Sequence, residues 1–125
     1  MELVAEAKEN IENLSPAEVA AELEKGGVVL VDLREQHELD AQGVIQGAIH
    51  APRGMLEFHA DPSTPYHLEE LARGARVVLY CASGGRSALA CSTLKDLGYS
   101  DIAHLEGGFK AWAGAGNPVK QSPSR

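Results

Sequence analysis

Three things are scarce in this sequence: cysteine, positive charge and long apolar runs. Two cysteines in 125 residues are too few for a disulfide scaffold, which predicts a reducing, cytoplasmic setting. Eleven basic side chains against 18 acidic ones give a net charge of −7, which repels polyanions and argues against nucleic-acid binding. No run approaches the roughly 18 apolar residues that span a membrane, so we expect a soluble protein with no membrane partner.

Signals for targeting and for metal binding are also missing. The first six residues are acidic and lack the basic flank and apolar stretch of a secretory signal. The five histidines show neither an HxxxH pattern nor the spacing of a cysteine and histidine ligand set. We therefore expect no metal and no cofactor.

Length and composition fit a single domain with a core of its own. With 125 residues, 44% of them hydrophobic and 23% charged, the chain is close to the average for globular proteins and long enough to fold without disulfide or metal support. We expect a helical extension over residues 1–14, one domain over residues 15–118 and a flexible tail over residues 119–125.

Helical patterns open the chain. Leu3, Ala7, Ile11 and Leu14 recur at helical spacing and predict an amphipathic helix or turn. The sequence SPAE at residues 15–18 then has the form of a capping box with proline at the first helical position. It predicts a second helix over residues 16–25, which the following pair of glycines ends.

Apolar runs then alternate with further helical patterns. Strands are predicted at residues 28–33, 76–80 and 101–105, and the first is a continuous apolar run rich in β-branched residues, typical of a strand buried on both faces. Helices are predicted at residues 34–42, 54–59, 67–73 and 87–97, and after residue 108. This alternation predicts an α/β domain with a mostly parallel sheet, in which ligands bind at the carboxyl ends of the strands.

A cysteine stands where the second of these strands ends. Cys81 directly follows residues 77–80, and Gly84 and Gly85 lead into a helical pattern. Such a turn leaves backbone N–H groups pointing at one spot beside the positive end of a helix dipole, which favours an anion there. A helix N-terminus with an arginine nearby, here Arg86, also favours the reactive thiolate form of a cysteine. The pattern predicts an anion site with a nucleophile, although an ordinary buried cysteine at a strand end fits the same spacing.

Together these features resemble the rhodanese-like (sulfurtransferase) domain family over roughly residues 15–118. Residues 29–35 (VLVDLRE) are similar to the family's first strand with its Asp-x-Arg-Glu ending, and residues 43–49 (GVIQGAI) are similar to the motif Gly-His-Ile-x-Gly-Ala. Residues 105–112 (LEGGFKAW) look like the C-terminal signature, and the cysteine loop lies before them in the expected order. Val44 stands where the family commonly has histidine, a position that we take as structural.

The resemblance implies a rhodanese-like three-layer α/β/α domain and a double displacement at one cysteine. Cys81 would take a sulfane sulfur from a donor, become a persulfide and pass the sulfur to cyanide or a thiol. The loop residues implied to bind the donor are Ala82, Ser83, Gly84, Gly85, Arg86 and Ser87. Because the loop carries a single cation, a persulfide on a small thiol or on a partner protein competes with thiosulfate as the expected donor.

Several side chains have two interpretations. Arg86 either orients the donor or forms a surface ion pair, and Ser87 either hydrogen-bonds the sulfur or caps the helix. Asp32 and Arg34 are expected to be structural, since opposite charges at a strand end commonly brace neighbouring loops. Cys91 falls on the expected core face, which predicts packing rather than a second reactive thiol.

Two other functions fit parts of the pattern. Cysteine phosphatases of related α/β folds also combine a cysteine, a backbone cradle and an arginine, but their loop is one residue longer than the four residues between Cys81 and Arg86. A non-catalytic rhodanese-like binding module needs neither of these two residues, so their presence argues against it. It remains as a sulfur carrier, in which Cys81 holds a persulfide for a partner.

Overall fold

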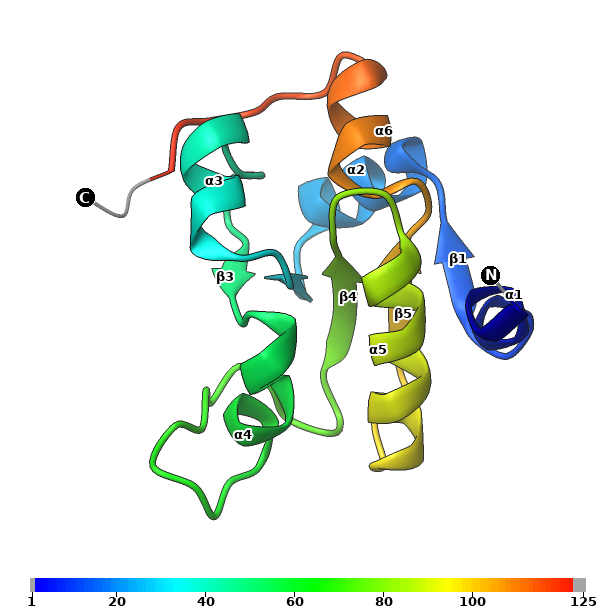
Figure 1. The fold of residues 1–125 in the computed structure, drawn as a ribbon, viewed down its shortest axis with the longest axis vertical. Coiled ribbons are helices and arrows are strands. Elements are labelled where there is room, and N and C mark those ends of the chain that lie inside the picture. The colour runs from blue at the N-terminus through cyan, green and yellow to red at the C-terminus, as the bar shows by residue number, and fades with distance from the viewer. Residues whose placement is uncertain (1, 123–125) are drawn as a thin grey trace.

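The three predicted strands form the centre of a parallel sheet. The computed structural model describes residues 2–122. Its sheet has the order β1-β5-β4-β2-β3, and every strand pair is parallel (Figure 1). The strands are β1 (Glu12–Leu14), β2 (Val28–Asp32), β3 (Ile49–His50), β4 (Arg76–Tyr80) and β5 (Ile102–Leu105). β2, β4 and β5 coincide with the predicted strands, and their continuous apolar sequences suit strands covered on both faces.

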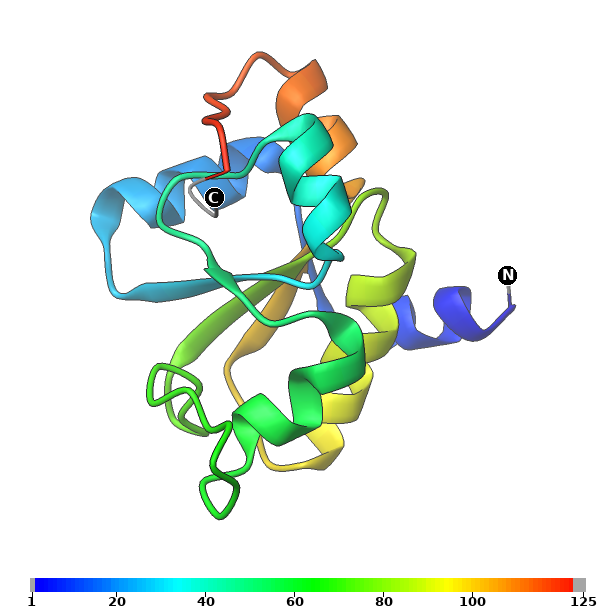
Figure 2. The same cartoon turned by 60° about the vertical axis from the view of Figure 1, so that its left-hand side comes forward.

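Helices cover both faces of the sheet, which gives three layers. They are α1 (Glu2–Glu9), α2 (Pro16–Lys25), α3 (Gln36–Gln42), the 3-10 helix η1 (Arg53–Met55), α4 (Leu56–Ala60), α5 (Gly85–Asp96) and α6 (Gly108–Gly114). Figure 2 shows α2 and α6 on one side of the sheet and α4 and α5 on the other. The core divides in the same way, with Leu56 and Leu94 in one cluster and Val19 and Trp112 in the other. The predicted α/β/α architecture is confirmed.

The start of α2 follows its local sequence signal. The Ser15 hydroxyl accepts a hydrogen bond from the Glu18 N–H at 3.1 Å, and the Glu18 carboxylate accepts one from the Ser15 N–H at 2.8 Å. This is the predicted capping box, which satisfies two amides that the first helical turn leaves unpaired. Among the described residues, no helix is long and apolar enough to cross a membrane.

The predicted N-terminal helix is wrong in its second half. α1 ends at Glu9, and residues 12–14 instead form β1, in which Asn13 lies opposite His104 of β5. Leu14 is buried in the core on this strand, so the apolar spacing suited both structures. The open edge of β5 decides between them, because it offers main-chain partners to an extended segment.

The predicted helix at residues 67–73 is also wrong. These residues form turns, and the Leu68 N–H donates to the carbonyl of His59 at 2.8 Å. The Leu71 N–H turns back to the carbonyl of Leu68 at 2.9 Å. The His67 N–H donates to the carbonyl of Thr64 and the Leu68 N–H to His59 in α4, so the first amides of the segment are bonded to residues before it and no helical turn begins there.

The chain after α6 folds back over the end of α3. Val44 and Lys120 exchange two main-chain hydrogen bonds, of 2.8 and 2.9 Å, in an antiparallel bridge. Ser122 is 8% exposed, although we expected a flexible tail from residue 119. The remaining residues of that predicted tail, 123–125, lie outside the described part of the chain.

A buried ion pair holds the end of β2. Arg34 is 0% exposed and donates two side-chain hydrogen bonds to Asp32, of 3.0 and 2.7 Å. The same guanidinium donates to the carbonyl of Gly43 at 2.8 Å and lies 4.2 Å from the ring centroid of Phe109. The Tyr80 hydroxyl donates to the Asp32 carboxylate at 2.6 Å. The pair thus joins β2, β4, the end of α3 and α6, which confirms the structural role expected for Asp32 and Arg34.

Removing the carboxylate of this pair should destabilise the fold strongly. We expect Asp32→Ala to lower the free energy of unfolding by about 3–5 kcal/mol, because it leaves a buried guanidinium without a counter-ion. Tyr80→Phe removes one hydrogen bond to the same carboxylate and should cost about 1–3 kcal/mol. Urea unfolding monitored by circular dichroism measures both.

The paired replacement is the control for this prediction. Asp32→Leu combined with Arg34→Met removes both charges, so the double variant should be more stable than Asp32→Ala alone. A double variant that is no more stable than Asp32→Ala would show that the unpaired charge is not the cause.

Candidate functional site

Cys81 lies at the carboxyl edge of the sheet, where β4 ends. It is 1% exposed and free of any disulfide. The loop that follows turns at Gly84, whose φ of 108° is left-handed and therefore suits glycine. α5 begins at the next residue, so its N-terminal turn faces the sulfur.

Backbone and hydroxyl donors surround the Cys81 sulfur. The Gly84 N–H lies 3.1 Å from Sγ and the Ser87 N–H 3.4 Å from it. The Ser87 hydroxyl oxygen lies 3.6 Å from Sγ. Ser87 stands one turn inside α5, whose N-cap is Gly84, so its side chain contacts the sulfur rather than capping the helix. This arrangement can hold a sulfur anion.

The start of α6 supports the loop from behind. The N–H groups of Phe109 and Lys110 donate to the carbonyls of Cys81 and Ala82, at 2.8 and 3.0 Å. A side chain on Gly108 would lie 2.6 Å from the Cys81 carbonyl oxygen. Glycine at this position therefore allows the two segments to touch, which gives a physical reason for the GGF sequence at residues 107–109.

Arg86 is held by a carboxylate that we did not predict. Its guanidinium donates two hydrogen bonds of 2.9 Å to Glu38 on α3. Hydrogen bonding from Arg86 lowers the pKa of Glu38 to about 2, so the carboxylate stays charged at neutral pH. Of the two interpretations of Arg86, the ion pair is present, and it leaves the side chain 39% exposed.

The loop residues predicted to bind the donor do not all face the sulfur. Gly84 and Ser87 contact Sγ directly, whereas the side chain of Ser83 is on the exposed tip of the loop. Ala82 contributes its carbonyl to the contact with α6. The contacts to Sγ thus come from the second half of the loop.

Three polar residues around the loop were missed in the sequence: Glu38, His104 and Asn13. Glu38 lies among other acids in a polar helix, and nothing in the local pattern singles it out. His104 gave the best signal, since it is a histidine between apolar neighbours on a predicted strand. It is 0% exposed, and its Nδ1 lies 2.8 Å from the Ser87 hydroxyl.

Cys91 has the packing role that its spacing predicted. It is 0% exposed in the core cluster beneath α5. Burial raises the pKa of its thiol, which keeps it protonated and unreactive. Among residues 2–122, no group of three or more His, Cys, Asp or Glu side chains is placed to hold a metal ion.

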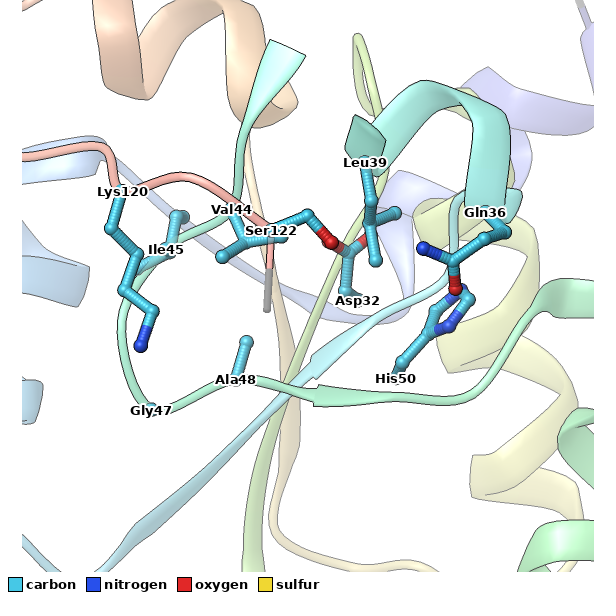
Figure 3. Close-up of a pocket in the computed structure, with 10 residues that line it drawn as sticks. All are labelled: Asp32, Gln36, Leu39, Val44, Ile45, Gly47, Ala48, His50, Lys120 and Ser122. Atoms are coloured by element: carbon cyan, nitrogen blue, oxygen red, sulfur yellow. The ribbon is translucent and has the colours of Figure 1, made fainter. Parts of the chain in front are cut away.

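A separate hollow of about 140 Å³ lies beside α3 (Figure 3). Its lining comes from the end of β2, α3, β3 with the loop before it and the C-terminal segment, and no residue of the Cys81 loop contributes to it. Two of its polar side chains are already engaged: Asp32 accepts from Arg34, and His50 Nε2 lies 2.6 Å from the Arg34 carbonyl. The Cys81 loop is therefore the better candidate for chemistry.

The fold and the loop define a class of protein: a parallel α/β domain with a cysteine in a turn whose N–H groups point at its sulfur. Residues 15–115 match the rhodanese-like domain family. The chain therefore belongs to this family, as its sequence motifs predicted.

Similar proteins include a sulfurtransferase of Allochromatium vinosum. It is 38% identical over 92 residues, which cover 74% of this chain and 78% of that protein. In a longer relative, a probable adenylyltransferase/sulfurtransferase of Mycobacterium tuberculosis, the matching region is 35% identical but makes up only 24% of the protein. The family is thus found both alone and within larger proteins.

Solved structures give the same fold. A protein of unknown function from Rhodopseudomonas palustris, described as a possible tyrosine phosphatase, has a TM-score of 0.89 and 42% identity, and the match covers 94% of this chain and 91% of that one. The polysulfide-sulfur transferase homodimer of Wolinella succinogenes has a TM-score of 0.77 and 30% identity, with 98% and 87% covered.

The pair between Glu38 and Arg86 should make stability depend on pH in acid. The folded protein holds the pKa of Glu38 at about 2, below the ordinary value of about 4.3. Its contribution to stability is therefore complete above the ordinary value and is lost as the pH falls toward 2. We expect Glu38→Gln to flatten the fall in urea midpoint across this window.

The control is Glu69→Gln, which removes an exposed carboxylate from a turn at the opposite end of the sheet. It should leave the acid limb of the stability profile close to that of the wild type. If Glu38→Gln and Glu69→Gln give the same profile, the ion pair does not contribute.

Proposed function

We propose that this protein is a sulfurtransferase that carries a sulfane sulfur on Cys81. The observation that carries the proposal is the cradle around Sγ, formed by the Gly84 and Ser87 N–H groups and the Ser87 hydroxyl. Fixed donors of this kind stabilise an anion at the sulfur, both as thiolate and as persulfide. Membership of the rhodanese-like family and the similarity to proteins named as sulfurtransferases support it.

The reaction is a double displacement. The Cys81 thiolate attacks the outer sulfur of the donor, a new S–S bond forms, and the donor's own bond to that sulfur breaks with its electron pair on the departing group. That group is sulfite when the donor is thiosulfate and a thiolate when the donor is a persulfide. A thiolate or cyanide then attacks the outer sulfur, and the electron pair of the Cys81 bond returns to Cys81.

The charge around the loop favours a persulfide donor over thiosulfate. Arg86 is the only cation in residues 81–87, and its bidentate pair with Glu38 sets a carboxylate beside it. A dianion such as thiosulfate is repelled by that carboxylate, whereas a persulfide on a thiol carries less charge. The donor is therefore a small-molecule or protein persulfide in this proposal, and the acceptor is a thiol.

A phosphatase is the second candidate, because one similar structure is described as a possible tyrosine phosphatase. The short loop argues against it. Four residues separate Cys81 from Arg86, and the guanidinium is paired with Glu38 instead of lying free above the cysteine to meet a phosphoryl group. Hydrolysis of an aryl phosphate that disappears in Cys81→Ser would favour the phosphatase.

Intact-mass spectrometry tests the proposed carrier directly. After exposure to a persulfide-generating desulfurase, or separately to thiosulfate, the wild-type protein should gain the mass of one sulfur atom, and a thiol should remove it. Cys81→Ser should gain none, because it lacks the nucleophile. Cys91→Ala is the matched control and should still be loaded, since Cys91 is buried away from the loop.

Two results would reject this proposal. One is the absence of any adduct on the wild type with either donor, which would favour an inert binding module. The other is an adduct of the same mass on Cys81→Ser.

Removing the charge of Glu38 should change the choice of donor. A like charge near an incoming anion at the surface is worth about 1 kcal/mol or slightly more, so Glu38→Gln should speed loading from thiosulfate by roughly fivefold. Loading from a neutral or singly charged persulfide should change much less. The measurement is the loading rate with each donor, followed by intact mass.

Glu69→Gln controls for net charge, because it removes the same charge at the opposite end of the sheet. It should leave the ratio of the two loading rates unchanged. An equal change in both rates for Glu38→Gln would mean that this carboxylate does not discriminate between donors.

A further inference from the structure

A line of buried polar groups leads away from the Cys81 sulfur into the protein. The Ser87 hydroxyl lies 3.6 Å from Sγ and 2.8 Å from His104 Nδ1. Ser87 and His104 are both 0% exposed. On the far side of the ring, Nε2 lies 2.8 Å from Asn13 Oδ1 and 3.3 Å from Glu106 Oε1. Neither the sheet nor the helices need this chain of side-chain contacts for their own hydrogen bonding.

The contacts of Asn13 determine which nitrogen of the His104 ring carries the proton. The Asn13 amide nitrogen donates to the carbonyls of Lys8 and Ile11, at 2.9 and 3.2 Å. Its amide oxygen must then be the atom that faces His104, and an oxygen can only accept. Glu106 presents a second acceptor to the same nitrogen. Nε2 is therefore the protonated nitrogen of the neutral ring.

This tautomer of His104 sets the direction of the hydrogen bonds that lead from Cys81 through Ser87 to the ring. With Nε2 protonated, Nδ1 has a free lone pair and accepts the Ser87 hydroxyl proton, although the Gly84 carbonyl at 3.2 Å is a second acceptor for it. The Ser87 oxygen then turns a lone pair toward Cys81. Burial lowers the pKa of His104, which keeps the ring neutral while Cys81 is a thiol.

We infer that Ser87 and His104 form a proton relay that takes up the thiol proton when Cys81 becomes a thiolate. The S–H bond of Cys81 breaks, its electron pair stays on sulfur and its proton passes to the Ser87 oxygen. The hydroxyl proton of Ser87 passes at the same time to His104 Nδ1. The products are a thiolate that accepts a hydrogen bond from Ser87, and an imidazolium whose Nδ1–H donates to the same hydroxyl.

The charged groups around the ring are arranged to receive this proton. Within the described chain, the Glu106 carboxylate faces Nε2 from the end of β5, and Lys8 on α1 pairs with Glu106 at 2.8 Å. Asn13 on β1 and Ser87 on α5 supply the neutral contacts. The Glu106 carboxylate stabilises a positively charged His104 ring, and the Lys8 ammonium weakens this effect. His104 can therefore hold the proton and return it. His104 acts through Ser87 and is a positioning residue.

The inference rests on the proposed role of Cys81 as a nucleophile, but its test needs no sulfur donor. The far-ultraviolet absorbance of the thiolate, with Cys81→Ser as the blank, measures how much of Cys81 is ionised at each pH. Removing the relay should move thiolate formation in His104→Gln toward higher pH by about one unit, the size of shift that one charged or hydrogen-bonding partner produces. Ser87→Ala should give a similar displacement.

The double variant separates a relay from two independent effects. Because the two residues act in series, His104→Gln combined with Ser87→Ala should move the profile no further than either change alone. Asn13→Ala should give a smaller displacement in the same direction, although Asn13 is exposed and does not touch Cys81. His37→Gln, which changes an exposed histidine in the same way, should leave the profile unchanged.

Nitrogen-15 resonances of the His104 ring supply a readout that a structural role would not move. In the wild type, Nδ1 should keep its proton to higher pH than in Cys81→Ser, because the Cys81 thiolate stabilises the imidazolium, and Nδ1 should be protonated over part of the pH range in which the thiolate absorbance is present. The inference is overturned if Nδ1 stays unprotonated in the wild type while the thiolate forms. It is also overturned if Ser87→Ala and Asn13→Ala leave the thiolate profile in place. Loading of sulfur in the intact-mass experiment with an unmoved profile would reject the relay and keep the proposed function.

Discussion

The position of the Cys81 loop depends on the buried pair between Asp32 and Arg34. The guanidinium reaches the Gly43 carbonyl and the ring of Phe109, and the carboxylate accepts the Tyr80 hydroxyl. Tyr80 is the residue before Cys81, and the Phe109 N–H donates to the Cys81 carbonyl. Burying two charges costs free energy unless all of their hydrogen-bonding positions have partners. The partners of Asp32 and Arg34 lie on segments on either side of Cys81, so the pair holds these segments together.

The site itself is built mainly from main-chain groups. Gly84 and Ser87 direct N–H groups at the sulfur, and Gly108 lets α6 approach closely enough to hold the loop carbonyls. Fixed dipoles do not reorganise when charge develops, so they stabilise a sulfur anion at little further cost. Arg86 contributes less to stabilising such an anion, because its charge is already paired with that of Glu38.

The sequence was most informative where local physics decides the structure. The continuous apolar runs of β2 and β4, the SPAE capping box and the glycine turn after Cys81 are each set by nearby residues. β1 was misread because Ile11 and Leu14 suit either a helix or a strand, and only the distant edge of β5 decides between them. Glu38, Asn13 and His104 reach the loop from three separate elements. Their contact with the site follows from strand order and register, which pairs 13 with 104, and the one-dimensional pattern contains no trace of that pairing.

The near-complete burial of the Cys81 sulfur, 1% exposed, affects how long a sulfur carried on it would last rather than how tightly a donor would bind. A persulfide on an open surface meets water, oxygen and every passing thiol, so its lifetime is short. In the proposed function, a sulfur carried on Sγ would be surrounded by the loop and screened from these reactants. The same walls that slow the entry of a donor would then lengthen the interval over which the sulfur is kept for its proper recipient.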